Sequence, residues 1–369
     1  MVEFKVPLID LKERYKDEKD ELLSCVEKVL ERGNLVLTPE LMDFEERVAK
    51  YTKSKYCIGL NSGTDALMMG LHAMGIGKGD EVITSPISFI ATTAAIAHVG
   101  ATPVYVDVGE DQNIDPLKIN EKITSRTKAI MPVHWTGRIS DMLNINKIAK
   151  QYNLMVIEDS CQCMGAYYHG QHAGTFGKVG TFSGHPLKAM NAIGDAGFLI
   201  TNDQEIANKV RIYRNHGLID RDTCVEYGVN SRLDVLHAAV LLYRMEKLSG
   251  VIDKRRNNVN LYRKLIKAKE VFIPTCKPHE QNAFVMFLIQ AKRRDKLKEF
   301  LDKRGIQTLV YYAKALHLQP AAKRYNYRRG DFPVAEKQAD EVLALPHHQY
   351  LTNDQIKFVS ESINEFYQL

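Results

Sequence analysis

The chain has 369 residues, of which 45% are apolar and 26% charged; this composition is typical of a globular protein, and the length favours two domains. The net charge of +5 is spread along the chain and indicates no nucleic-acid partner, and no apolar run is long enough to predict a membrane-spanning helix. The six cysteines form no CxxC pair, which predicts reduced thiols in a cytoplasmic protein and argues against a metal site.

Short apolar runs alternate with longer amphipathic runs through the first half of the chain. This alternation predicts an α/β fold with a mostly parallel sheet covered by helices on both faces. Ligands of such sheets bind at the carboxyl ends of the strands. We expect strands at 56–60, 81–84, 102–106, 129–133, 154–157, 179–182 and 198–200, and helices at 64–74, 88–98 and 142–152.

The last third of the chain has a different pattern. Thr352 and Gln355 have the spacing of a capping box at the start of the last helix. The change of pattern predicts a large α/β domain over 1–250 and a smaller α+β domain over 251–369, with the N-terminal segment placed against either one. In this part we expect a long charged helix from about residue 251, strands at 283–290 and 307–312, and helices at 293–303 and 354–366.

Lys188 lies in a setting suited to covalent chemistry. An apolar strand ending at Phe182 leads into Ser183, a proline-containing turn and Lys188, and a second apolar strand begins at Phe198. A lysine held between buried strands loses hydration, which lowers its pKa and favours Schiff-base formation with a carbonyl. The alternative is a solvated surface lysine.

A carboxylate, Asp159, ends the apolar strand at 154–157. A buried acid needs a cationic or hydrogen-bonding partner. The protonated ring nitrogen of a pyridoxal cofactor would serve, because the carboxylate lets the ring absorb electrons. A helix N-terminus or an arginine would serve equally well.

Small residues follow the strand at 56–60, where a helix begins. The free backbone N–H groups of Ser62, Gly63 and Thr64 suit a phosphate, although an ordinary helix cap explains them too. Ser183 is either a phosphate ligand or a turn residue. Phe89, after the next strand, would stack on a flat cofactor or pack in the core.

The order of these motifs resembles the DegT-type sugar aminotransferases, which are fold-type I pyridoxal-phosphate enzymes. The resemblance covers essentially the whole chain and implies a mostly parallel seven-stranded sheet with a smaller C-terminal domain. It is carried by 6–11, 61–67, 75–83, 133–137, 157–162, 194–197, 214–217, 228–234 and 330–336.

The resemblance implies a role for each site residue. Lys188 would hold pyridoxal 5'-phosphate as a Schiff base and move the proton, Asp159 would pair with the ring nitrogen, and Gln162 would approach the ring hydroxyl. Asn230 would reach the cofactor phosphate of a neighbouring subunit, which implies a homodimer with composite active sites. The remaining cofactor residues would be Ser62, Gly63, Thr64, Ser183 and Phe89, and the residues shaping the sugar site, or merely packing, would be Trp135, His185, Tyr311, Tyr312 and His317.

The implied reaction transfers an amino group from L-glutamate to a keto-sugar, with pyridoxamine 5'-phosphate as the aminated form of the cofactor. The expected acceptor is a nucleotide-linked 3- or 4-keto-6-deoxy sugar used for surface glycans such as lipopolysaccharide. The alternatives are a keto form of an eight-carbon sugar acid (8-amino-octulosonate type), a pyridoxal-phosphate-dependent dehydratase or lyase, and a non-catalytic regulator. Gly184 departs from the aromatic residue usual in relatives, a change expected to widen the site.

Overall fold

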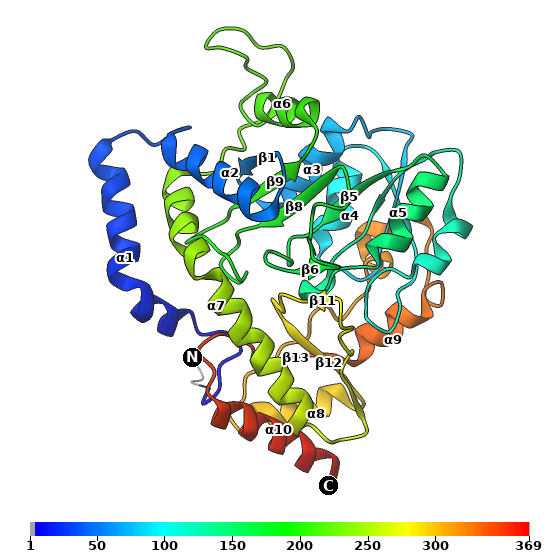
Figure 1. Cartoon of the computed structure of the whole chain (residues 1–369). Coiled ribbons are helices and arrows are strands. Elements are labelled where there is room, and N and C mark those ends of the chain that lie inside the picture. Colours follow the sequence, from blue (N-terminus) through cyan, green and yellow to red (C-terminus); the bar gives the residue numbers. More distant parts are fainter. Residues whose placement is uncertain (1–3, 369) are drawn as a thin grey trace.

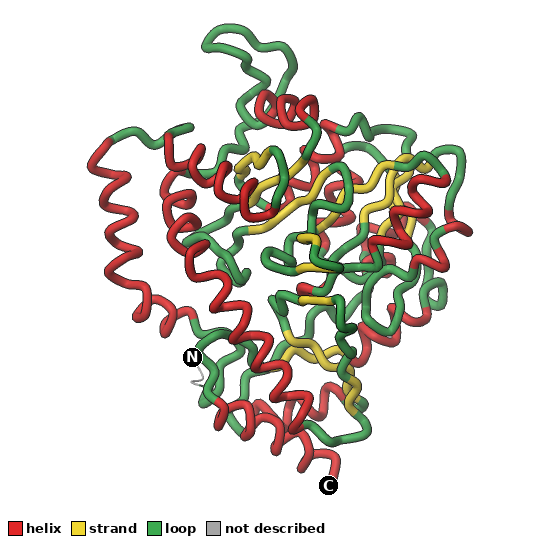
Figure 2. Tube along the Cα trace, in the orientation of Figure 1, coloured by secondary structure: helices red, strands yellow, loops and turns green. Residues whose placement is uncertain are grey.

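Seven strands form the central sheet in the order β1–β9–β8–β5–β4–β2–β3 (Figures 1 and 2). In the computed structural model, which describes residues 4–368, every neighbouring pair is parallel except the two pairs that include β9. The predicted mostly parallel seven-stranded sheet is therefore confirmed. The strands are β1 (Tyr56–Leu60), β2 (Glu81–Thr84), β3 (Thr102–Tyr105), β4 (Thr127–Met131), β5 (Met155–Asp159), β8 (Val179–Ser183) and β9 (Gly197–Thr201).

Helices cover both faces of this sheet (Figure 1). One apolar cluster joins the sheet to α3 (Gly63–Ala73), α4 (Ile90–His98) and α6 (Gln204–Tyr213). On the opposite face, two clusters join it to α2 (Pro39–Thr52), α5 (Met142–Gln151) and α7 (Val235–Leu265). Strands β1, β2, β4, β5 and β8 run in one direction, so their carboxyl ends meet at one edge.

The C-terminal part is built around a three-stranded antiparallel sheet of β10 (Val271–Phe272), β12 (Phe287–Ala291) and β13 (Val342–Leu345). The N-terminal segment lies against this part, since Val6 pairs with Ile306. The 31-residue helix α7 passes through residue 250 without a break, and the division at that residue remains a prediction. The other elements are α1 (Leu11–Arg32), β6 (Tyr167–Tyr168), β7 (Gln171–His172), β11 (Glu280–Gln281), α8 (Arg294–Lys303), α9 (Pro333–Glu341) and α10 (Asn353–Gln368).

Several predicted bounds are wrong for physical reasons. The strand predicted at 129–133 ends at Met131, because Pro132 has no N–H to donate. The strand predicted at 283–290 begins only at Phe287, because Ala283 and Val285 donate to the carbonyls of Gly137 and Thr136 instead. The segment 307–312 forms only an isolated bridge, at Leu309.

The helices differ from the prediction mainly where they begin. Helix α7 starts at Val235 rather than near residue 251, and α4 starts at Ile90 because Phe89 is extended. The capping box is confirmed: Thr352 N donates to Gln355 Oε1 at 3.0 Å, and Gln355 N donates to Thr352 Oγ1 at 3.1 Å. Among the described residues, no helix has the length and apolarity needed to span a membrane.

Candidate active site

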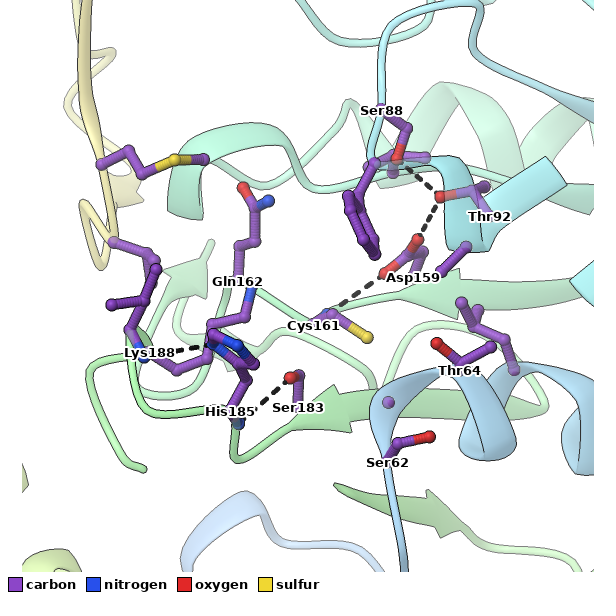
Figure 3. A pocket seen from close by; sticks show the side chains of 18 of the residues that line it. Ser62, Thr64, Ser88, Thr92, Asp159, Cys161, Gln162, Ser183, His185 and Lys188 are labelled. Carbon is purple, nitrogen blue, oxygen red and sulfur yellow. Dashed lines mark hydrogen bonds between the residues drawn. The ribbon is translucent and has the colours of Figure 1, made fainter. Parts of the chain in front are cut away.

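A cavity of about 380 Å³ lies at the carboxyl ends of β1, β5 and β8 (Figure 3). It brings together most of the predicted site residues, although the elements that carry them are far apart in the sequence. The predicted residues that line it are Ser62, Gly63, Thr64, Phe89, Asp159, Gln162, Ser183, His185, Lys188, Tyr311 and Tyr312.

The N-terminus of α3 points free backbone N–H groups toward the cavity. Ser62 is the N-cap, and its Oγ accepts from Asp65 N at 3.1 Å. The first backbone hydrogen bond of the helix is donated by Ala66 N to the Ser62 carbonyl. The N–H groups of Gly63 and Thr64 therefore remain available to a ligand. Ser183, at the end of β8, adds a hydroxyl on the cavity wall. Ser62 is thus a helix cap in a setting that also suits a phosphate.

Glycine is required at position 63 by close packing. A Cβ there would come within 2.9 Å of both Cys161 Sγ and Ser183 Cβ. Gly197 is similarly constrained, because its Cβ would lie 2.1 Å from the Ser62 carbonyl carbon. These contacts bring the backbone of α3 close to β8 and β9 at the cavity floor.

Asp159 ends β5 as a buried carboxylate that no cationic side chain of the described residues pairs with. Its Oδ2 accepts from Thr92 Oγ1 at 2.6 Å, and its Oδ1 accepts from Cys161 N at 3.3 Å. Neither an arginine nor a helix N-terminus therefore explains this acid. A pyridoxal cofactor bound in the cavity would bring a cationic ring nitrogen to this carboxylate, so Asp159 fits such a cofactor.

The preceding residue, Glu158, has a different role. It is fully buried and lies 2.9 Å from the Nε2 atom of His134. It also accepts backbone N–H groups from Gly174, Phe176 and Gly177 at 2.6–2.7 Å. The hydrogen bonds of Glu158 are satisfied inside the protein, where it holds the loop 174–177. Glu158 does not line the cavity, whereas Asp159 does.

Lys188 lines the cavity from the loop between β8 and β9 (Figure 3). Burial lowers its pKa, and the neighbouring groups Cys161, Asp159 and Cys163 oppose that effect. No salt bridge within residues 4–368 involves Lys188, so the amine is free to react. A lysine with a lowered pKa beside an unpaired carboxylate fits the covalent attachment of an aldehyde cofactor.

Aromatic and amide groups border the same space. Gln162 Oε1 accepts from Thr136 N at 2.7 Å, which leaves the amide NH₂ as the donor available to a ligand. The Phe89 side chain is 50% exposed, and its ring centroid lies 5.8 Å from that of Tyr312. Phe89 is thus not a core residue and is available to stack on a ligand.

Three predicted residues do not line the cavity. Trp135 is buried, and its ring centroid lies 5.5 Å from that of Tyr312 on the cavity wall. His317 is buried with its Nε2 3.0 Å from Glu336 Oε1. Asn230 is exposed and pairs with Asn215 in the loop between α6 and α7, which projects from the molecule (Figure 1).

Gly184 does not itself line the cavity, although its neighbour Ala196 does, and the widening expected from the glycine remains a prediction. Gly184 is buried, and a Cβ on it would lie 2.9 Å from the Cβ of Ala196. Thr92, Ser88 and Cys161 also border the cavity and were not predicted as site residues from the sequence. Only the position of Thr92 near the start of a helix after Phe89 could have indicated its role.

The fold and the residues of this cavity define a fold-type I pyridoxal-phosphate enzyme. A helix N-terminus, a strand-end carboxylate and a lysine amine surround one cavity, and within residues 4–368 neither the carboxylate nor the amine has a salt-bridge partner. The sequence pattern of the DegT/DnrJ/EryC1/StrS aminotransferase family matches residues 16–364. The chain belongs to this family.

Relatives match over almost the whole chain. A pleiotropic regulatory protein from Geobacillus stearothermophilus is 39% identical and covers 98% of this chain and 99% of its own. A dTDP-3-amino-3,6-dideoxy-alpha-D-galactopyranose transaminase from Aneurinibacillus thermoaerophilus is also 39% identical, with the same coverage. The crystal structure of DesV from S. venezuelae with a ketimine intermediate is 36% identical, covers 99% of both chains and has a TM-score of 0.96. The prediction of a pyridoxal-phosphate-dependent sugar aminotransferase is confirmed.

Proposed function

We propose that this enzyme transfers the amino group of L-glutamate to a nucleotide-linked 3- or 4-keto-6-deoxy sugar. The observation that carries the transfer chemistry is that Lys188 and Asp159 line one cavity, and that within residues 4–368 neither forms a salt bridge with a residue outside it. The dTDP-sugar named for the Aneurinibacillus relative supports a nucleotide-linked acceptor aminated at position 3.

Five residues of the cavity then have defined roles. Pyridoxal phosphate, when bound, supplies an aldehyde that takes up the amino group and a ring that withdraws electrons. Gly63, Thr64 and Ser183 bind its phosphate, and Asp159 keeps its ring nitrogen protonated. The Lys188 Nζ atom holds the cofactor at rest and carries the proton to and from the reacting carbon.

The proposed enzyme is a homodimer whose cavity is completed by a second copy. Phe89, Ile90 and Ile193 are large apolar side chains that are 50%, 42% and 48% exposed. The projecting loop that carries Asn230 also exposes Tyr227, which is 98% exposed. A second copy would cover such residues and would bring its Asn230 to the cofactor phosphate.

An absorption spectrum before and after addition of L-glutamate tests the proposal. A visible band that moves to the near ultraviolet, followed by amination of a dTDP-linked keto-sugar, supports it. Lys188→Ala should lack the absorption band of the lysine-bound cofactor. Its rate of amino transfer should fall by at least about 10²-fold. A cofactor band indifferent to glutamate would favour a lyase or another donor, and the absence of any band would favour the regulator that the Geobacillus relative's name suggests.

A further inference from the structure

One buried arginine contacts the loop that carries Lys188. We call residues 184–196, between β8 and β9, the lysine loop. Arg244, on α7, is 6% exposed, and its Nη1 donates to the carbonyls of Asn191 and Ala192 at 2.8 and 3.1 Å. The same nitrogen lies 3.2 Å from Asn191 Oδ1. Arg244 therefore holds both the backbone and a side chain of the lysine loop.

The other side of the same guanidinium contacts the N-terminal helix. Arg244 Nε and Nη2 donate to Glu18 Oε2 at 2.9 and 2.7 Å. Glu18, on α1, is 3% exposed and also accepts from Arg14 Nε at 3.1 Å. The planar guanidinium thus bridges two elements in a way that the single ammonium group of a lysine does not reproduce.

The contacts of Arg244 continue toward Lys188. Asn191 uses its Oδ1 for Arg244 and donates from Nδ2 to the carbonyl of Pro186, two residues before Lys188. Ala192 N donates to the Gly184 carbonyl at 2.7 Å, which closes the loop on itself. Gly184 and Pro186, which precede Lys188, are therefore hydrogen-bonded to Ala192 and Asn191, which follow it and which Arg244 holds.

We propose that Arg244, oriented by Glu18, is a positioning residue that fixes the lysine loop and so sets where the Lys188 amine lies in the cavity. Arg244 does not line the cavity. Its effect on the reaction passes through Asn191 and Ala192. This inference rests on the proposed role of Lys188.

The test compares Arg244→Lys with Arg138→Lys. Arg138 is buried to a similar extent, at 5% exposed, and pairs with Glu280 away from the lysine loop. In the cofactor-free enzyme, amide hydrogen exchange of residues 184–196 should rise in Arg244→Lys beyond any global loss of stability. In the loaded enzyme, the pH midpoint of the visible band should move, and the half-reaction with glutamate should slow by about 10–100-fold. Arg138→Lys should show neither effect.

Unchanged exchange in the lysine loop and an unchanged band midpoint would overturn the proposal, even if Arg244→Lys melts at a lower temperature. If Arg244→Lys does not fold, Asn191→Ala tests the same bridge with the same readouts and the same criterion. The wild-type response to glutamate is recorded first. If the wild type lacks it, the proposed function fails, while exchange in the cofactor-free enzyme still decides whether Arg244 fixes the loop.

Discussion

Thr92 Oγ1 donates a 2.6 Å hydrogen bond to Asp159 Oδ2 and so connects the first turn of α4 to the end of β5. The Thr92 hydroxyl is itself 2.5 Å from Ser88 Oγ, and Cys161 N donates to the other carboxylate oxygen. Both oxygens of Asp159 thus have a fixed donor, which sets the orientation of the carboxylate before any ligand arrives. A carboxylate that is already oriented loses less conformational entropy when it binds a ring nitrogen.

Thr92→Val should slow the half-reaction with glutamate while leaving the fold intact. A hydrogen bond to a charged group is worth about 1.5–3 kcal/mol, which corresponds to roughly 10–100-fold in rate. Thr93→Val is the matched control, because Thr93 is also buried but lies 3.0 Å from the Tyr105 hydroxyl instead. Stopped-flow spectra of both variants give the comparison, and equal losses would rule out a specific role for Thr92.

The adjacent acids Asp159 and Glu158 should respond in opposite ways to removal of their charge. Asp159→Asn should keep the melting temperature near that of the wild type and lose on the order of 10²-fold or more in rate, because an amide no longer keeps the ring nitrogen protonated. Glu158→Gln should lose stability instead, since Glu158 accepts three backbone N–H groups. Thermal melts and steady-state rates separate the two effects; loss of folding in Asp159→Asn would contradict the assignment.

The sequence predicted the sheet and the strand-end residues because both depend on local patterns. An apolar strand followed by Asp159 or Ser183 can be recognised from a few consecutive residues of the sequence. The parallel order of strands then places these ends together. Fold and cofactor cavity follow from such short patterns.

Contacts between distant segments could not be predicted in the same way. Thr92 and Asp159 are 67 residues apart, and Arg244 and Glu18 are 226 apart. No local pattern distinguishes Arg244 from the exposed arginines elsewhere in the chain. The predicted strand at 307–312 was wrong for a similar reason. Its apolar residues suit a strand, but the segment forms one isolated bridge and places Tyr311 and Tyr312 on the cavity wall.

Gly63→Ala should weaken cofactor binding. The added methyl group would meet Cys161 Sγ and Ser183 Cβ at 2.9 Å and would move the N-terminus of α3 away from β8. Gly250→Ala is the control: it lies within α7, and its Cβ would meet nothing within 4 Å. That substitution should raise the free energy of unfolding by up to about 1 kcal/mol. Fluorescence titration with pyridoxal phosphate measures the affinities, and unaltered binding by Gly63→Ala would contradict close packing at this site.

Lys188→Met should stabilise the cofactor-free enzyme at neutral pH. Burial lowers the pKa of the Lys188 amine in the folded state, so its charged form is disfavoured there relative to the unfolded chain, where the ordinary value is 10.5. Because the unfolded state binds more protons between these two pKa values, the stability of the wild type rises with pH across that interval. The advantage of Lys188→Met is therefore full below the folded-state pKa and disappears as the pH approaches 10.5.

Thermal melts of the cofactor-free proteins across this pH range give the measurement. Lys178→Met is the control, because Lys178 is a surface residue whose ammonium lies 3.9 Å from Asp203; its removal should change the melting temperature little at any pH. A melting temperature of Lys188→Met that stays at or below that of the wild type throughout would show that burial of the amine carries no free-energy cost. The predicted gain reflects the conflict between stability and a reactive lysine that must stay unpaired in its cavity.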